Sequence, residues 1–314
     1  MDKDFYNSSS AASLGWNPAW FGCDEFDVNL VKAVQKWQKK NGLTADGLVG
    51  PATYRRIWTE REANISSYKS RRHVSTSGDK HIVHNGSFIP IEWNNVILWD
   101  EPSGFKSKKG CYTDYSGKPD RKPTFFVNHW DVCLSAESCA RVLNNRKVSV
   151  HFLIDNDGTI FQMLDTQHKA WHAGIPRFEG GNTKGIGVEI SNAYYLKYQD
   201  WYVNHGFGER PIQENAWVHG KKLDPFLDFY PVQLEALKAL WKAIHIGHGI
   251  PLEYPKNSNG HIETGVHKDC ERGKFHGFCN HYNFTKSKKD CAGLDLPNLL
   301  NAVKNEPIYC MDTE

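Results

Sequence analysis

Long apolar runs are missing from this chain. No stretch approaches the roughly 18–20 consecutive apolar residues that a membrane-spanning helix needs, so we expect no membrane insertion. The opening residues, MDKDFYNSSSAASLGW, also lack the apolar core that follows a positive segment in a secretory signal. We therefore expect a protein that stays in the cytoplasm where it is made until another factor releases it.

A surplus of charge of one sign is missing as well. The chain has 38 Lys and Arg against 36 Asp and Glu, a formal net charge of +2, and its paired basic residues are scattered along the sequence. A nucleic-acid-binding protein normally gathers a basic surplus on one face. We therefore expect no nucleic-acid partner, and we expect a monomer.

Cysteine is sparse, with 8 residues in a chain of 314. That is too few for a secreted disulfide scaffold, and in a reducing compartment such thiols are metal ligands or buried apolar residues. We interpret Cys133 and Cys139, which flank an apolar helical run, as core residues. The H-E-x-x-H helix of zinc proteases is absent. In contrast, 39% hydrophobic and 13% aromatic residues indicate a folded chain, long enough for more than one domain.

The first readable segment runs from Phe26 to Trp58. Val31, Val34 and Trp37 recur at helical spacing, and a Gly- and Asp-rich turn then leads to a second helix that begins at Pro51. These features predict a small all-α bundle. The segment also resembles the peptidoglycan-binding domain that is appended to many cell-wall hydrolases. The residues that carry this resemblance are Gln35, Gly42, Leu43, Asp46, Gly47, Gly50 and Thr53.

The resemblance implies that residues 1–60 anchor an enzyme to peptidoglycan and have no chemistry of their own. The composition then becomes polar and charged, without apolar periodicity, so we interpret residues 61–80 as a linker. Residues 81–310 form the second predicted domain. Its apolar runs alternate between strand-like and helix-like periodicity, with hairpin turns at Asn85-Gly86 and Asp157-Gly158. This pattern predicts an α/β domain in which helices flank a mixed central sheet.

Three positions in the second domain have the residue types that catalysis needs. His129 ends a predicted strand, and Glu189 lies inside an otherwise apolar strand, where a carboxylate is costly unless it is paired or functional. The run HYNFTKSKKDCAG contains His281 and Cys291. Taken singly, these residues also fit a core histidine, a structural ion pair and a solvated loop.

Together they resemble one family. VNHW, VHFLIDNDGTIFQMLD, AWHAG, GIGVEIS and HYNFTKSKKDCAG occur in the order and approximate spacing of the zinc-dependent N-acetylmuramoyl-L-alanine amidases, the type 2 amidases that share the peptidoglycan-recognition-protein fold. The resemblance covers Pro123 to about Gly293. It implies an enzyme that cleaves the amide between N-acetylmuramic acid and the L-alanine of the stem peptide, using water activated by zinc.

The resemblance also assigns roles to single residues. It makes His129, His281 and Cys291 the ligands of one catalytic Zn²⁺, and three protein ligands leave a fourth position for water. It gives proton transfer to Glu189 and stabilisation of the oxyanion to Lys289. The predicted substrate-binding residues are Trp171, His172 and Asn192.

A second metal site is a further hypothesis. The segment HKDCERGKFHGFC contains two H-x-x-C pairs, a spacing that a structural zinc can use. A disulfide or a set of unpaired buried thiols explains the same segment equally well. The four residues are His267, Cys270, His276 and Cys279.

Three functions fit the resemblance. The first is a phage endolysin that accumulates in the host cytoplasm and acts on peptidoglycan after a holin-type pore releases it. The second is a cytosolic amidase that recycles muropeptides, although such an enzyme has no obvious use for a module that binds polymeric wall. The third is a non-catalytic peptidoglycan receptor, which the presence of Cys291 disfavours, because receptors of this family typically lack that ligand.

Overall fold

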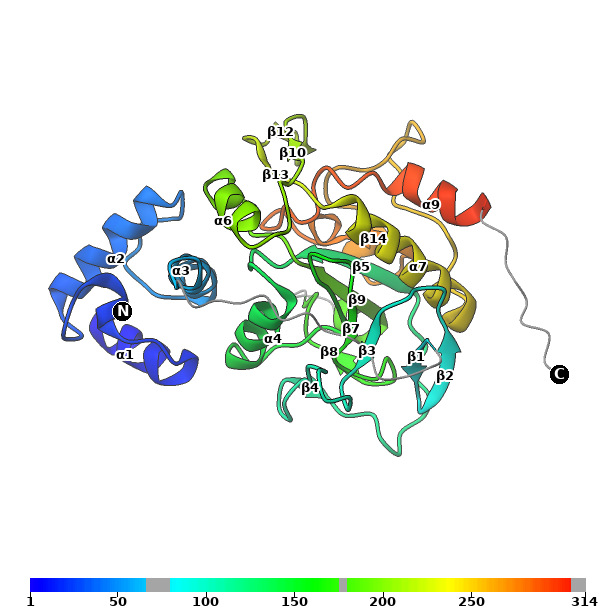
Figure 1. The fold of residues 1–314 in the computed structure, drawn as a ribbon, viewed down its shortest axis with the longest axis horizontal. Helices are drawn as coiled ribbons and strands as arrows, with labels where there is room; N and C mark the ends of the chain where they lie inside the picture. The colour runs from blue at the N-terminus through cyan, green and yellow to red at the C-terminus, as the bar shows by residue number, and fades with distance from the viewer. Residues whose placement is uncertain (66–79, 175–179, 306–314) are drawn as a thin grey trace.

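The computed structural model describes residues 1–65, 80–174 and 180–305 (Figure 1). Most of the predicted linker, residues 61–80, lies outside these ranges. Within them, no helix has both the length and the apolar character of a membrane span.

The N-terminal part is helical, as predicted. It consists of α1 (Lys3–Leu14), η1 (Pro18–Phe21), α2 (Val28–Lys40) and α3 (Pro51–Ala63). The turn between α2 and α3 is organised by Gln38, which the sequence reasoning missed. Its side-chain amide donates to Asp46 Oδ1 at 2.8 Å and to Thr53 Oγ1 at 3.0 Å, and its carbonyl accepts from the Gly47 N–H at 2.8 Å.

Several residues of the binding-domain pattern therefore have structural roles. Gly47 has φ +78°, and a Cβ there would lie 2.7 Å from Val31 Cγ1, so glycine is required. Gly50 is the N-cap residue of α3. Gln35 extends along the same turn and donates to the Ala45 carbonyl at 3.4 Å.

The remaining elements form the second domain. The strands of its main sheet are β3 (Val96–Leu98), β5 (Phe125–Trp130), β6 (Phe152–Ile154), β7 (Ile160–Gln162), β9 (Gly185–Ile190) and β14 (Gly277–Asn280). Shorter strand pairs are β1 (His81–His84) with β2 (Ser87–Pro90), β4 (Tyr112–Thr113) with β8 (Lys169–Ala170), β10 (Ile212–Gln213) with β13 (Phe226–Leu227), and β11 (Trp217–Val218) with β12 (Lys221–Lys222). The helices are α4 (Ala136–Asn145), α5 (Gly180–Lys184), η2 (Leu196–Tyr198), α6 (Gln199–Asn204), α7 (Pro231–His248), α8 (Lys268–Glu271), η3 (His281–Asn283) and α9 (Leu296–Asn305).

The main sheet is mixed, with strand order β14-β5-β9-β6-β7-β3. Only β6 and β7 pair antiparallel, across the predicted turn at Asp157-Gly158; the other neighbours are parallel. Helices flank the sheet on both sides, with α7 and α4 on opposite faces in Figure 1. The prediction of a mixed central sheet between helices, with a small helical N-terminal bundle, is confirmed.

Side chains alternate along each strand, and this alternation decides on which face of the main sheet each side chain lies. Phe126 in β5 and Val188 in β9 belong to the core that contains Leu240 of α7, whereas Leu153 of β6 belongs to the core that contains Leu143 of α4. Because successive side chains of a strand point to opposite faces, the residues at odd positions of β5 and β9 face α4. His129 and Glu189 are odd-numbered, and they are register partners across β5 and β9.

Candidate active site

Three neighbouring strands bring the candidate residues together. His129 lies near the end of β5, next to Glu189 on β9. On the other side of β5, Asn128 pairs with Asn280, the last residue of β14, and His281 follows at once. The sequence did not predict β14, so the approach of His281 to His129 comes from strand pairing. The three side chains thus meet at the carboxyl ends of parallel strands.

The two histidines converge on one carboxylate. His129 Nδ1 and His281 Nδ1 lie 2.9 Å apart, and Asp290 Oδ2 lies 3.1 Å from the first and 2.9 Å from the second. The three potential ligand atoms all lie within 4.8 Å of one another. Two nitrogens and one carboxylate oxygen that converge in this way are a donor set that zinc accepts.

The ionisation of these groups suits a cation. Burial and the neighbouring His281 lower the pKa of His129 to about 3, so its imidazole is neutral and has a free lone pair. Burial alone would raise the pKa of Asp290, but His281 and the hydrogen bonds from both histidines hold it well below its usual value. The site therefore presents two neutral imidazoles and one carboxylate, the protonation states that metal ligands require.

The structure does not bring the predicted third ligand, Cys291, to the two histidines. Asp290, rather than Cys291, lies beside the two histidines. The side chain of Cys291 is fully buried in the apolar core that contains Phe278 and Leu294, and burial raises the pKa of its thiol well above the usual value. In this structure the thiol therefore lies in the apolar core, away from the two histidines. The sequence signal for Asp290 was available, because a carboxylate directly precedes the cysteine.

The same shift of one residue applies to the predicted lysine. Lys289 Nζ donates to the Tyr194 hydroxyl at 3.0 Å and lies 4.2 Å from the centroid of that ring, outside the cavity at the metal site. Lys288 lines this cavity instead. Asp290 and Lys288 keep the spacing that the sequence analysis gave to Cys291 and Lys289.

Mutation of each lysine tests whether Lys288 or Lys289 takes part in the reaction. We expect Lys288→Ala to lower kcat by about 10²-fold, because it removes a cation that lines the cavity beside the two histidines. Lys289→Ala, as the matched control, should change kcat by no more than a few fold, since its ammonium lies on Tyr194. Steady-state kinetics on a soluble muramyl peptide measure both values. A larger loss in Lys289→Ala than in Lys288→Ala would restore the original assignment.

Glu189 is the only carboxylate besides Asp290 among the described residues that line the cavity. Its side chain is 7% exposed, and Oε2 has no hydrogen-bond partner in the described part of the chain. Burial raises the pKa of Glu189 to about 8, although the guanidinium of Arg55, 3.9 Å from Oε1, works in the opposite direction. A carboxyl group with a pKa near neutrality can both accept and return a proton.

The cavity that joins these residues has a volume of about 270 Å³. Its lining residues are Arg55, His129, Leu143, Arg146, Val148, Trp171, His172, Gly174, Asn182, Glu189, His281, Lys288 and Asp290. Trp171 and His172 are therefore placed where the sequence analysis expected them. His172 Nδ1 lies 3.0 Å from His129 Nε2, so His172 also orients the first histidine.

Asn192 does not line this cavity, contrary to its predicted role in substrate binding. Its side chain is fully buried, donates to the Leu227 carbonyl at 2.6 Å and accepts from the Tyr194 N–H at 2.8 Å. Both ends of the amide are therefore used to fix the loop after β9. The residue is structural.

The second predicted zinc site is not assembled. Among the described residues, the groups that could hold a metal do not include His267, Cys270, His276 or Cys279. His276 is exposed, whereas Cys270 and Cys279 are buried in an apolar cluster with Phe125. Buried thiols, one of the alternatives in the sequence analysis, describe this segment best.

A different trio, Asp131, Cys133 and Cys139, is compact enough to hold a metal. However, Asp131 already accepts hydrogen bonds from the backbone N–H groups of Cys133 and Asn192, both at 2.9 Å, and from Ser191 Oγ at 3.1 Å. Burial also raises the pKa of the Cys133 thiol. We interpret this trio as part of the core, in line with the prediction for the two cysteines.

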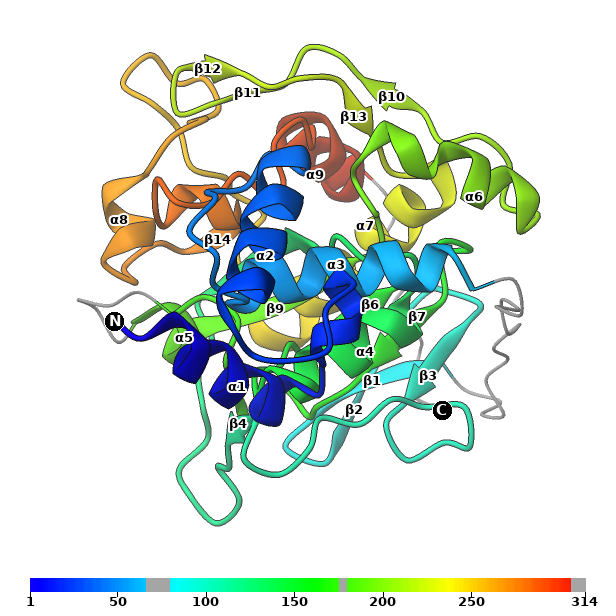
Figure 2. The same ribbon diagram turned by 90° about the vertical axis from the view of Figure 1, so that its left-hand side faces the viewer.

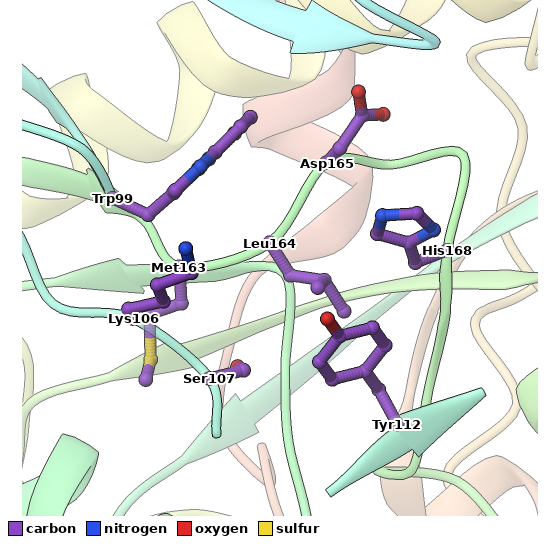
Figure 3. A pocket seen from close by; sticks show the side chains of 8 residues that line it. All are labelled: Trp99, Lys106, Ser107, Tyr112, Met163, Leu164, Asp165 and His168. Carbon is purple, nitrogen blue, oxygen red and sulfur yellow. The ribbon is translucent and has the colours of Figure 1, made fainter. Parts of the chain in front are cut away.

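A separate hollow of about 120 Å³ lies beside β7 and β4 (Figure 3). Trp99, Tyr112 and His168 line it, and none of the metal-site residues does. Its carboxylate, Asp165, accepts hydrogen bonds from the backbone N–H groups of Asn85 and Gly86. This hollow is therefore distinct from the candidate active site.

Comparisons with known proteins agree with this geometry. Residues 119–291 match the N-acetylmuramoyl-L-alanine amidase family, and residues 14–57 match a peptidoglycan-binding domain. A curated relative, 1,6-anhydro-N-acetylmuramyl-L-alanine amidase AmpD of Escherichia coli, is 39% identical over 57 residues, which are 17% of this chain and 31% of that protein. The chain thus spans about a third of the length of the curated relatives it matches.

Solved structures with a similar fold include a mutant endolysin from Bacillus subtilis, with 20% identity, a TM-score of 0.35 and coverage of 67% of this chain and 96% of that one. Another is AmpDH3 from Pseudomonas aeruginosa in complex with an anhydromuramic pentapeptide, with 20% identity, a TM-score of 0.37 and coverage of 59% and 61%. The family match includes more than half of the chain and contains His129, Glu189 and His281, together with both Asp290 and Cys291. The chain belongs to the N-acetylmuramoyl-L-alanine amidase family.

Proposed function

We propose that the protein is a zinc-dependent amidase that cleaves the bond between N-acetylmuramic acid and the L-alanine of the peptidoglycan stem peptide. The observation that carries this proposal is the convergence of His129, His281 and Asp290 beside Glu189 in one cavity. Membership of the amidase family supports the same bond.

A metal ion bound between His129, His281 and Asp290 explains their close contacts better than hydrogen bonds among the three side chains do. His129 Nδ1 and His281 Nδ1 lie 2.9 Å apart, and burial lowers the pKa of both imidazoles. Two neutral imidazoles can share only one proton at such a contact, so a cation between the nitrogens and the carboxylate satisfies all three groups. Zn²⁺ bound there would act as a Lewis acid and would lower the pKa of a bound water.

The other residues of the cavity supply the proton transfer and the charge. Glu189, as a carboxylate, accepts the proton of the attacking water and returns it to the amine that leaves. Lys288 lies on the rim of the same cavity, where its ammonium can stabilise negative charge on the substrate oxygen. Trp171 presents an aromatic face to the sugar or the peptide.

We further propose that the natural substrate is the polymeric wall and that the protein is a phage endolysin. The match of residues 14–57 to a peptidoglycan-binding domain supports this reading, because a module that binds the wall raises the local concentration of polymeric substrate. An enzyme that recycles soluble muropeptides gains nothing from such a module. In this reading, the protein accumulates in the host cytoplasm and reaches the wall after a holin-type release.

One experiment tests both parts of this proposal, the amidase activity and the preference for polymeric wall. Purified sacculi and soluble muropeptides are incubated with the protein, with and without a zinc chelator, and the products are analysed by mass spectrometry. We expect zinc-dependent release of stem peptides with a free L-alanine amino terminus, and faster turnover of sacculi than of muropeptides at equal bond concentration. Binding to sacculi without cleavage under any metal condition would exclude the amidase and leave a receptor. Faster turnover of soluble muropeptides would favour recycling.

A further inference from the structure

Helix α3 of the N-terminal module lies directly on the second domain. Figure 2 shows α3 crossing in front of α4 and the sheet. The hydrogen bonds that join them include Trp58 Nε1 to Ser138 Oγ at 3.2 Å, Thr59 Oγ1 to the Val132 carbonyl at 2.8 Å, and Asn145 Nδ2 to the Tyr54 hydroxyl at 3.0 Å. The module is therefore docked at the face of the sheet that carries the candidate active site.

This contact is a packed interface. Tyr54 is fully buried, and it belongs to the same apolar core as Cys139 and Leu143 of α4. Glu62, only 6% exposed, accepts a hydrogen bond from the Ser138 hydroxyl. Separating α3 from α4 would expose these apolar surfaces and leave a buried carboxylate without its partner, which costs free energy. In this structure, α3 is thus one wall of the active-site cavity.

Arg55 is the residue that α3 contributes to this cavity. Its side chain is 20% exposed and lines the cavity together with Arg146, Glu189 and Lys288. Its guanidinium lies 3.9 Å from Glu189 Oε1, too far for a hydrogen bond, and makes no hydrogen bond with any residue in the described ranges. The Arg55 donors are consequently available to a ligand.

The charge balance of the cavity identifies the kind of ligand. Three cationic side chains line it against two carboxylates, and one of these, Asp290, is already held by two histidines. Arg146 Nε is also buried without a hydrogen-bond partner among the described residues. Two guanidinium groups with unused donors in one cavity are suited to a carboxylate, which arginine binds through two parallel hydrogen bonds.

We propose that Arg55, supplied by the wall-binding module, binds a carboxylate of the stem peptide, so that the module forms part of the substrate site as well as an anchor. This inference rests on the proposed function for the identity of the substrate. It gives the docked module a second role, because a peptide that lacks the carboxylate would lose the contact with α3. Arg55 thereby contributes to the choice of substrate.

The test measures binding of the reaction product, so that it does not depend on catalysis. The stem peptide with free carboxylates and the same peptide with its carboxylates amidated are titrated calorimetrically into the zinc-loaded full-length protein. We expect the carboxylate form to bind at least about tenfold more tightly, since paired hydrogen bonds between a guanidinium and a carboxylate are stronger than those to a neutral amide. Arg55→Ala should lose most of this preference by weakening the carboxylate form alone.

Two further variants serve as controls. Arg61→Ala removes an exposed guanidinium from the same helix, outside the cavity, and should keep the preference. Arg55→Lys keeps the positive charge but loses the two parallel N–H donors of the guanidinium. This variant should retain part of the preference for the carboxylate form. The ratio of the two affinities within one variant corrects for any loss of folded protein. An unchanged ratio in Arg55→Ala would refute the inference, whereas a preference in a protein that hydrolyses nothing would refute the proposed function alone.

Discussion

Asp290→Ala is expected to abolish metal binding and to lower kcat/KM by at least about 10³-fold, because it removes one of the three proposed ligands and the only charged one. Cys291→Ala should retain zinc and most of the activity, since its thiol is buried in the apolar core and the change leaves only a small void. The two residues are adjacent, so each variant is a control for the other.

The measurement is the zinc content of the purified variants by elemental analysis, together with their kinetics on a soluble muramyl peptide. Circular dichroism shows whether each variant is folded. A Cys291→Ala protein that lacks zinc, alongside an Asp290→Ala protein that holds it, would restore the cysteine as third ligand. His129→Ala is the positive control for loss of metal, because His129 is a proposed ligand whether the third ligand is Asp290 or Cys291.

Glu189→Gln is expected to lower kcat by about 10²–10⁴-fold and, at the same time, to stabilise the metal-free fold. Activity falls because the amide cannot accept the proton of the attacking water. Stability rises because burial raises the pKa of Glu189 from 4.5 to about 8 in the folded protein. Above pH 4.5 the unfolded chain releases this proton while the folded chain still holds it, so the wild-type protein loses stability as the pH rises towards 8.

The direction in which the stability difference between wild type and Glu189→Gln changes with pH can be measured directly. We expect the melting temperatures of chelator-treated wild type and Glu189→Gln to agree near pH 4 and to separate as the pH rises to 8, with a difference in unfolding free energy on the order of a few kcal/mol. Glu235→Gln, at an exposed position on α7, is the surface control measured alongside it. A constant difference, or one that grows towards acid, would show that the raised pKa does not govern the stability.

Local patterns in the sequence predicted the parts of this protein that depend on local chemistry. The Asn85-Gly86 turn closes the hairpin of β1 and β2, and both residues have positive φ in the structure. Pro51, which was expected to begin a helix, begins α3. Glu189 was expected inside an otherwise apolar strand, and every residue of β9 is buried. The family motifs then directed attention to His129 and His281.

The choice between Asp290 and Cys291 could not be made from the sequence. Both residues are chemically competent ligands and lie at adjacent positions, so the motif fits either one with a shift of one residue. Only the packing distinguishes them, since one side chain meets the two histidines and the other enters the core. Lys288 and Lys289 were ambiguous for the same reason. The amide of Asn192 contacts Leu227 of β13 and the Tyr194 N–H, and the sequence shows neither contact.

The sequence by itself therefore determined the family, the order of the domains, several strands of the central sheet and two of the three converging side chains, because these depend on residue type and on spacing along the chain. The tertiary structure alone placed Asp290 beside the two histidines, Lys288 in the lining of the cavity and Arg55 of α3 next to Glu189. The first two features depend on which of two neighbouring side chains points into the cavity. The third depends on the docking of α3 against α4, where the contacting residues lie some 80 or more positions apart in the sequence. Contacts between such distant positions leave no local pattern, so folding had to bring them together before they could be recognised.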